Sequence, residues 1–411
     1  MELTKVKLSD IARVEISGVD KKSKPGQKSV RLCNFVDVYH NWAITQDMRD
    51  SFMEATASDK EIEALSIKKG QVAFTKDSET RDDIGIPTYI ADDFDDVVLG
   101  YHNALITPDE RKLNGKYLNA FMHSSYIQKY FENNASGSGQ RYTLSNDTVN
   151  SIPILLPSIK EQEKIGNLFS FIDRKIALNK KMNQKFETMA KRLYDYWFVQ
   201  FDFPDKNGRP YKTTGGSMTY NQILKREIPV GWEIKKLEEC INLFDSKRIP
   251  LSSQQRASKK GVIPYYGATG IMDYVDDFIY DGEYILLAED GSVETDDGFV
   301  IIQRIWGKTW VNNHAHVIQP KENGQYEFYY QVLSSIVAKK ITTGSIQKKI
   351  SQENMNAYKL LSPPKDLVLR YSLLVHDSWE KQKKIVEENV KLQNLRDKLL
   401  PLLMNGQVTI A

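Results

Sequence analysis

The sequence predicts an α+β protein with two similar mixed α/β domains and two long helices that pair as an antiparallel coiled coil, in a pseudo-two-fold internal repeat. Three observations predict this fold class. A series of sequence segments occurs twice in the same order, each copy ends in an apolar stretch followed by proline, and a long helical pattern follows each proline. The chain of 411 residues is also too long for one ordinary compact core.

The repeat is clearest where each predicted domain ends. LSNDTVNSIPILLP (144–157) aligns with ISQENMNAYKLLSP (350–363) at a shift of 206 residues. Further upstream, GQVAFTKDS (70–78) aligns with GEYILLAED (282–290) at a shift of 212 residues, as does NALITP (103–108) with AHVIQP (315–320). Because several segments agree in order and at a nearly constant shift, we infer an internal duplication.

The duplication divides the chain into five predicted segments. They are a first domain (1–157), a first spacer helix (158–200), a linker (201–227), a second domain (228–363) and a second spacer helix (364–404). The domains are expected to be rich in short strands and turns. The linker contains FDFPDKNGRPYKTTGG, and its Pro, Gly, Asn and Asp content predicts an irregular, exposed segment.

Each spacer helix is predicted from its apolar periodicity. Ser158 and Glu161 form a capping-box pattern at the start of the first helix. One seam row is Ile165, Ile172, Asn179, Phe186 and Leu193, and a second is Leu168, Lys175, Met182, Met189 and Tyr196. In the second helix the rows are Ile385, Leu392 and Leu399, and Leu395 and Leu402.

Two arrangements of these helices are open. Each helix could pack on its own domain, or the two could pair with each other as a spacer. Helices of about 35–40 residues would be roughly 50–60 Å long, which exceeds the width of a small domain and favours pairing. Asn179 in the seam could fix the register of the pair, or could simply be tolerated.

Composition narrows the class of protein. The net charge is only +2, so a nucleic-acid site would have to be a local basic patch. Two distant cysteines, no signal-peptide pattern and no apolar run near ~18 residues predict an intracellular, cytoplasmic protein without a membrane span.

Basic residues gather in loops of both predicted domains, interleaved with Ser, Gly, aromatic and amide residues. SGSGQRYT (136–143) and TTGSIQKK (342–349) occupy the same place in the repeat, which strengthens the case for DNA contact but leaves a plain solvated surface equally open. The candidate DNA-binding residues of the first domain are Lys21, Lys22, Lys24, Lys28, Arg31, Gln140 and Arg141. Those of the second are Arg256, Lys259, Lys260, Tyr265, Tyr266, Asn312, Asn313, Gln347, Lys348 and Lys349.

No catalytic residues and no metal ligands are predicted. HAH (314–316) has the alternating histidines of some metal sites, but no third ligand is evident among the six histidines, and the first copy has HNAL (102–105). A polar strand face is the favoured interpretation of this motif. Local motifs assemble neither a Ser-His-Asp nor a Cys-His arrangement.

At this point the chain resembles a known family, the specificity subunits of type I restriction-modification enzymes. IPYYGATGIMDYVDDFIYDGEYILLAEDG (263–291) and WVNNHAHVI (310–318) are similar to its target-recognition domains. LLPSIKEQEKIGNLFSFIDRKI (155–176) is similar to its central conserved region. The second copy departs from the pattern, because SPPKDLVLRYSLL lacks the Glu-Gln pair.

The resemblance implies that each domain reads one half of a split double-stranded DNA target, while the helices set the spacer and dock two methyltransferase subunits. Those partners would bind S-adenosylmethionine, and restriction subunits would use ATP and Mg²⁺. The chain itself would be non-catalytic and without a cofactor. The alternatives are a stand-alone nuclease or methyltransferase with its own recognition domain, and a scaffold whose domains bind proteins instead of DNA.

Overall fold

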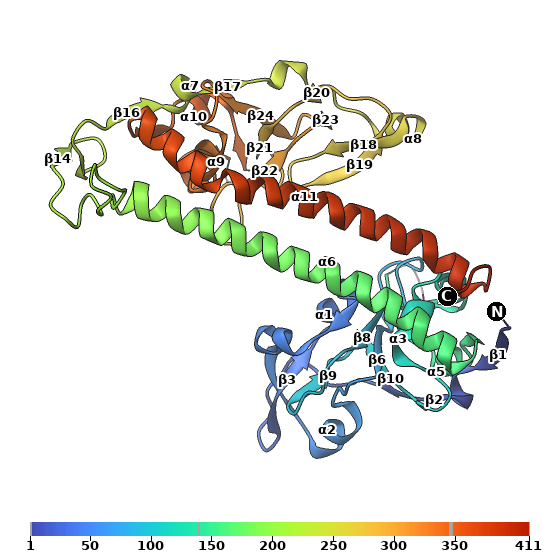
Figure 1. Cartoon of the computed structure of the whole chain (residues 1–411). Helices are drawn as coiled ribbons and strands as arrows, with labels where there is room; N and C mark the ends of the chain where they lie inside the picture. Colours follow the sequence, from blue (N-terminus) through green and yellow to red (C-terminus); the bar gives the residue numbers. More distant parts are fainter. Residues whose placement is uncertain (1, 138–139, 345–347, 411) are drawn as a thin grey trace. The chain divides into compact units, whose positions relative to one another are not determined.

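The computed structural model describes residues 2–137, 140–344 and 348–410. The chain forms two compact units: unit 1 comprises Met1–Lys181 and Ile385–Ala411, and unit 2 comprises Met182–Lys384. Each unit contains one mixed α/β domain and a part of each of two long helices, α6 (Ile159–Tyr194) and α11 (Lys365–Met404) (Figure 1). Among the described residues, no helix is both long and apolar enough to cross a membrane.

The central sheet of unit 1 is buried on both faces. Its strand order is β2 (Ala12–Ile16), β10 (Asn103–Pro108), β6 (Val72–Thr75), β8 (Pro87–Ile90) and β4 (Ala43–Ile44), and β10 is antiparallel to both neighbours. Val72 and Phe74 belong to one apolar cluster and Ala73 to another, because successive side chains point to opposite faces. This double burial explains the continuous apolar runs in these strands.

Smaller elements complete unit 1. A second sheet has the order β5 (Met53–Ala57), β3 (Lys28–Cys33), β9 (Val97–Leu99), and β1 (Thr4–Lys7) pairs with β13 (Pro153–Leu156). The helices are α1 (Phe35–His40), α2 (Asp59–Leu65), α3 (Gly115–Met122), α4 (Ser125–Asn134) and α5 (Asn146–Asn150). Helix α2 begins with a capping box of Ser58 and Glu61, which satisfies its first free N–H groups.

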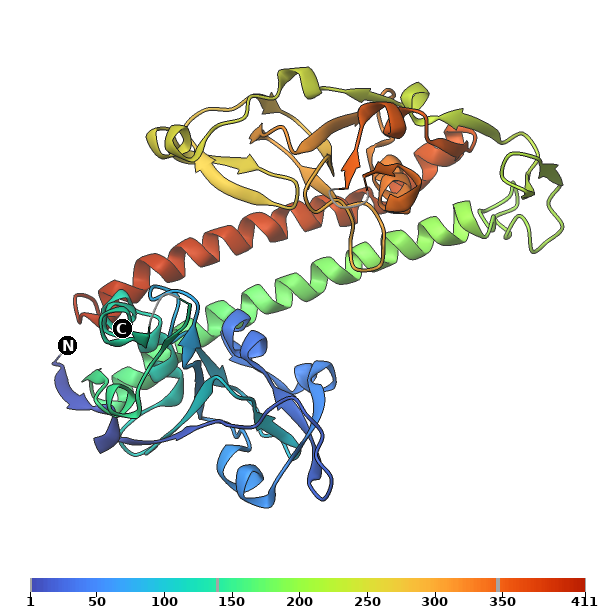
Figure 2. The ribbon, with the colours of Figure 1, turned by 180° about the vertical axis from the view of Figure 1, so that it is seen from behind.

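Unit 2 has corresponding sheets, and its domain is drawn from yellow-green to orange in Figure 2. One sheet has the order β17 (Ile241–Leu243), β24 (Ala315–Pro320), β21 (Tyr284–Ala288), β22 (Ile302–Ile305). The other has the order β19 (Ile271–Val275), β18 (Lys260–Tyr266), β23 (Lys308–Val311), β20 (Tyr280–Asp281), and β16 (Glu233–Lys236) pairs with β27 (Lys359–Ser362). The helices of this domain are α7 (Leu237–Cys240), α8 (Ser253–Ser258), α9 (Tyr326–Ser334) and α10 (Gln352–Asn356).

The strand pairings confirm the predicted internal repeat. In unit 1, β10 lies between antiparallel β2 and β6, and in unit 2 β24 lies between antiparallel β17 and β21. Likewise β3 has antiparallel β5 and parallel β9 as neighbours, and β18 has antiparallel β19 and parallel β23. The pairings correct the predicted alignment by one residue, because Asn103 pairs with Thr75 whereas Ala315 pairs with Ala288. Lys76 and Asp77 therefore correspond to Glu289 and Asp290.

The two long helices run antiparallel within each unit. In unit 1, Asn179 Nδ2 donates to Glu388 Oε2 over 2.8 Å, and Lys164 Nζ, earlier in α6, donates over 3.1 Å to the carbonyl oxygen of Ile410, which follows the end of α11. In unit 2, the Tyr371 hydroxyl donates to the Ala190 carbonyl over 3.0 Å, and Gln382 Nε2 to the Asn183 carbonyl over 3.2 Å. In both units, residues later in the α6 sequence contact residues earlier in the α11 sequence, so the two helices are antiparallel.

The predicted first seam row is buried or half-buried along both helices, whereas the second row is half-buried at Leu168, Lys175 and Leu402 but exposed between them. Ile165, Ile172, Asn179 and Ile385 are buried, and Phe186, Leu193, Leu392 and Leu399 are half-buried. Met182, Met189 and Tyr196 are exposed, as is Leu395. The buried row is one residue further along and contains Phe169, Ile176, Ala190 and Trp197. Both candidate rows contain apolar residues at most positions, so the periodicity alone did not separate them.

Each end of the helix pair also belongs to a domain core. Ile165 and Phe169 of α6 and Leu400 and Leu403 of α11 pack in the main apolar cluster of unit 1. Ala190 of α6, together with Leu367, Val368 and Tyr371 of α11, packs in that of unit 2. The two arrangements left open by the sequence are therefore both present: the helices pair, and their ends pack on domains.

The predicted exposed linker is wrong in its first part. After α6 the chain makes a π-helical turn, Asp195–Val199, and Phe201 and Phe203 are then buried in the core of unit 2. Their rings lie 5.3 and 5.5 Å from the ring of Trp232. A hairpin of β14 (Met218–Asn221) and β15 (Arg226–Pro229) follows. This segment is thus part of the fold of unit 2.

Candidate nucleic-acid interface

The basic loop of unit 1, SGSGQRYT (136–143), is fixed to the ends of two central strands, β6 and β10. Its hairpin strands, β11 (Ser136–Gly137) and β12 (Tyr142–Thr143), extend a small sheet with β7 (Asp77–Ser78), where Thr143 pairs with Asp77. The Leu144 amide donates to the Lys76 carbonyl over 3.0 Å, and the Lys76 amide donates to the His102 carbonyl over 2.8 Å. The residue after β6 and the residue before β10 therefore form the base of the loop.

Unit 2 holds its basic loop through the same three backbone contacts. The strands β25 (Thr342–Thr343) and β26 (Lys349–Ile350) pair, and Lys349 forms a bridge with Asp290. The Ile350 amide donates to the Glu289 carbonyl, and the Glu289 amide to the His314 carbonyl, each over 2.8 Å. The two loops are thus equivalent elements of the repeat.

A histidine–aspartate pair lies at the base of the loop in unit 1. His102 Nδ1 is 2.6 Å from Asp77 Oδ2, and Arg141 Nη2 is 3.5 Å from the same oxygen. Lys76 Nζ donates to Thr143 Oγ1 over 3.2 Å. Burial raises the pKa of Asp77, but hydrogen bonds from Thr143 and His102 and the charge of Lys76 outweigh it, so the pKa lies below its ordinary value.

The corresponding pair is present in unit 2. His314 Nδ1 is 2.5 Å from Asp290 Oδ1, and both side chains are partly exposed. The lysines of this loop have carboxylate partners: Lys349 Nζ is 3.2 Å from Glu289 Oε1, and Lys348 forms an ion pair with Glu294. These are ion pairs with partly exposed lysines, in which solvent weakens the attraction.

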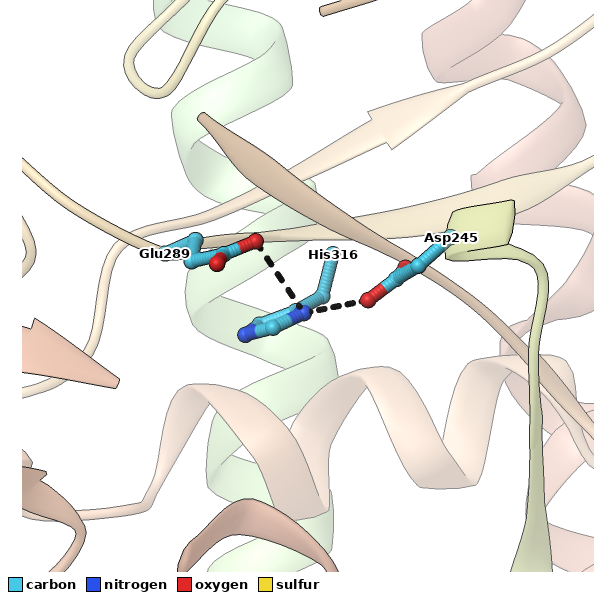
Figure 3. Close-up of side chains that lie close together, drawn as sticks. All are labelled: Asp245, Glu289 and His316. Atoms are coloured by element: carbon cyan, nitrogen blue, oxygen red, sulfur yellow. Dashed lines mark hydrogen bonds and ion pairs between the residues drawn. The ribbon is translucent and has the colours of Figure 1, made fainter. Parts of the chain in front are cut away.

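A buried polar cluster lies beneath the loop of unit 2 (Figure 3). His316 Nδ1 is 2.6 Å from Asp245 Oδ2 and 3.7 Å from Glu289 Oε2, and its Nε2 is 2.8 Å from the carbonyl oxygen of Ile350. Arg248 Nη1 contacts Glu289 Oε2 at 2.7 Å. Burial raises the pKa of Asp245, but hydrogen bonding and charge interaction with His316 outweigh it and lower the pKa overall.

This cluster has the residue types of a metal site, since the nearest ligand atoms of Asp245, Glu289 and His316 lie within 4.8 Å of one another. Sequence reasoning did not associate these carboxylates with the histidine motif, because Asp245 begins a distant 3-10 turn and Glu289 follows another strand, β21. Their oxygens already accept hydrogen bonds from Gln352 (2.6 Å), Arg248 and the Val317 amide (2.8 Å), so the cluster links the loop to the sheet. At the matching strand positions unit 1 has Ile16 and Ala104, so the cluster belongs to unit 2 alone.

The other predicted residues of unit 1 lie on the second sheet. Lys21, Lys22 and Lys24 are exposed in the turn before β3, and Lys28 Nζ is 2.7 Å from Asp59. Arg31 is half-buried and donates to the Phe52 carbonyl over 3.2 Å. Only Gln140 and Arg141 of the predicted set lie in the loop at the His102 base, where both are exposed.

Several predicted residues of unit 2 have internal roles. Tyr265 and Asn312 are only 1% and 3% exposed, and Arg256 donates to Asp273 (3.2 Å) and to the Leu251 carbonyl (2.7 Å). The hydrogen bond from Lys260 is the main cause that lowers the pKa of Asp273 to about 2. Because Tyr265 and Asn312 are covered by the domain, we do not propose them as DNA contacts.

The remaining predicted residues of unit 2 are more accessible. Lys259 lies 3.8 Å from Asp276, Asn313 is exposed, and Tyr266 is half-buried. Gln347 lies outside the described residues. The His102–Asp77 and His314–Asp290 pairs were missed by the sequence analysis, although His102 and His314 align at the shift of 212 residues found there.

Comparison with known proteins identifies the family. The model of the type I restriction modification DNA specificity domain matches residues 2–188 and 229–389. The HindI type I restriction enzyme specificity subunit of Haemophilus influenzae is 22% identical over 406 residues, with 84% of this chain and 87% of that relative covered. A putative type I restriction enzyme specificity subunit of the same organism is 34% identical over 149 residues, which is 36% of this chain and 38% of the relative.

A solved structure agrees with these relatives in fold. The crystal structure of the S subunit of the type I restriction-modification system of M. genitalium matches with a TM-score of 0.56 at 15% identity, covering 98% of this chain and 96% of that one. The two matched regions of the family model fall on the two halves of the repeat. The resemblance predicted from the sequence is therefore confirmed, and the chain belongs to the type I restriction modification DNA specificity family.

Proposed function

We propose that each domain reads one half of a bipartite DNA target and that the long helices set the unread spacer between the halves. One observation carries this proposal: both domains hold a basic loop on the same three backbone contacts. Lys and Arg side chains on such loops contact phosphates, while neighbouring polar groups reach base edges. A duplicated reader suits a target in two parts.

We further propose that the outer face of α6 docks methyltransferase subunits. Phe171 and Leu178 in unit 1, and Met182 and Met189 in unit 2, are exposed apolar side chains on this helix, and Tyr196 is exposed in the π-helical turn that follows it. Leu178 is 54% and Met189 is 63% exposed, and they belong to rows with heptad spacing. Exposed apolar residues at heptad spacing on a long helix are the pattern by which another helix packs against it.

In this proposal the chemistry belongs to the partners. The methyltransferase subunits would carry S-adenosylmethionine and act on an adenine of the DNA, and restriction subunits would use ATP and Mg²⁺. The chain would supply sequence recognition and geometry, with no cofactor of its own.

Methylome sequencing tests the proposal. Cells that carry the chain together with its methyltransferase partner should show one methylated motif made of two specified parts and an unspecified spacer, and deletion of the chain should abolish it. A continuous motif, or methylation that persists without the chain, would contradict the bipartite reading.

A further inference from the structure

We propose that His102 and His314 are equivalent phosphate-anchoring residues, one in each domain, which fix the two basic loops on the DNA backbone. Asp77 and Asp290 orient them. The inference rests on the proposed function, because it names the part of the DNA that these residues would contact.

The two pairs have the same place and the same geometry. Each histidine is the residue before the central strand (β10 or β24), and each aspartate is the second residue after its neighbour (β6 or β21). The Nδ1–carboxylate distances are 2.6 Å in unit 1 and 2.5 Å in unit 2. Both pairs lie next to the last strand of the basic loop, where Thr143 and Lys349 pair with the two aspartates.

The surroundings of the pairs differ between the domains. In unit 1 the adjoining residues are Lys76 and Thr143, whereas in unit 2 they are Glu289 and Lys349. Within the part of the chain that the structure describes, the buried cluster around His316 has no counterpart in unit 1. The histidine–aspartate pair is thus present in both domains although its surroundings differ. This fits a contact with the phosphate backbone, which is the same at every DNA sequence.

The hydrogen-bond chemistry suits an anion. A carboxylate only accepts, so Nδ1 carries a hydrogen, and Nε2 carries one only when the ring is the charged imidazolium. In unit 1 Arg141 Nη2 lies 2.5 Å from His102 Nδ1 and 2.7 Å from His102 Nε2, so the guanidinium is in contact with the imidazole ring. A phosphate oxygen placed beside the two groups would accept from the guanidinium and from an imidazolium Nε2–H.

His314 offers the same chemistry in unit 2. Its side chain is 48% exposed, and its Nδ1 is held by Asp290. Orientation by a carboxylate fixes where Nε2 points, which a flexible surface lysine cannot do. The lysines of the adjoining loop would add further phosphate contacts.

The test uses the chain assembled with its methyltransferase subunits, and His102→Ala and His314→Ala made separately. Dissociation constants are measured at several salt concentrations on a duplex with the methylome-defined target and on an unrelated duplex. Each variant should bind both duplexes about tenfold more weakly, as expected for one lost charge-assisted hydrogen bond. The slope of log affinity against log salt should fall in magnitude by about 0.9.

Rescue and a matched control separate a phosphate contact from a structural role. If the histidines contact phosphates, His102→Lys and His314→Lys should restore affinity and slope, because lysine supplies a cation. Lysine would not restore a structural role, because it cannot replace the histidine–aspartate geometry. His376→Ala is the control, since His376 on α11 has an exposed ring whose Nδ1 lies 2.8 Å from a carboxylate oxygen, that of the buried Glu327, and it should change neither quantity.

Three results would overturn the inference: unchanged affinity and slope in the alanine variants, failure of lysine to rescue them, or loss of preference at one base pair of the motif. The last would assign the histidine to base reading instead. Failure of the proposed function is a different result, because the wild-type complex would then show no preference for its target over the unrelated duplex.

Discussion

At the scale of single residues, the buried cluster of unit 2 has the largest energetic consequence. His316 lies between two carboxylates in the interior, with Arg248 beside them. Removal of one member leaves a buried charge without its partner, which costs more than the intact pair contributes.

We therefore predict that His316→Ala destabilises unit 2 by about 2–4 kcal/mol. Five of the six tryptophans lie in unit 2, so tryptophan fluorescence during denaturant unfolding follows this unit. His314→Ala, two residues away but exposed, should cost less than about 1 kcal/mol. Equal effects of the two substitutions would show that the buried contacts do not stabilise the unit.

A second residue predicts the pH dependence of unit 1. Burial raises the pKa of Asp173 on α6 to about 6, against an ordinary value of 3.8, with Arg396 opposing the shift. The folded state then holds this proton more tightly than the unfolded chain. Stability from this group is complete below about pH 4 and is lost as pH rises towards 6.

Asp173→Asn should accordingly leave stability unchanged at pH 4 and raise it by about 1–3 kcal/mol at pH 8. Hydrogen exchange of peptides from residues 165–181 measures this locally. Burial also lowers the pKa of His123 to about 3, which gives the opposite trend, but it is present in both proteins and cancels in their difference. If Asp173→Asn increased the stability equally at pH 4 and pH 8, the titration of Asp173 could not be the cause of the increase.

At the scale of elements, the long helices show what periodicity can and cannot predict. Their existence followed from the capping pattern and the apolar spacing of residues such as Ile165 and Ile172. Whether Leu168 or Phe169 is buried, and whether Met189 or Ala190 is, depends on the residues that pack against the helix. Those residues lie far away in the sequence, so local periodicity cannot identify them. The burial of Phe201 and Phe203 was not predicted for the same reason. The local Pro and Gly content does not show that both rings pack against Trp232.

The exposed row of α6 gives a prediction at this scale. Leu178→Asp and Met189→Asp should leave the chain folded, because both side chains already lie in solvent, but should weaken its association with methyltransferase subunits by at least tenfold. Co-purification and analytical ultracentrifugation measure the assembly. Gln184→Asp, also exposed on α6, is the control for added charge, and an equal loss in that variant would count against an apolar docking face.

At the scale of the whole molecule, the duplication was the feature that the sequence revealed most reliably. The duplication led to the fold class and the family, because segments in the same order can be recognised in both halves of the chain even where few residues are identical. The candidate site was predicted only in part. The loops were located, but the one-residue difference between the shifts of neighbouring strands hid the correspondence of Asp77 with Asp290. Residues such as Tyr265 and Asn312 satisfy the pattern of base-reading side chains while serving the interior.

The division of the chain into units has a consequence for synthesis on the ribosome. Unit 1 is assembled from residues near both ends of the described chain, and unit 2 is nested between them as an insertion. Leu400, Leu403 and Met404, which belong to the apolar interior of unit 1, emerge after all of unit 2. Unit 2 can thus reach its native state during translation before the interior of unit 1 is closed by these residues of α11.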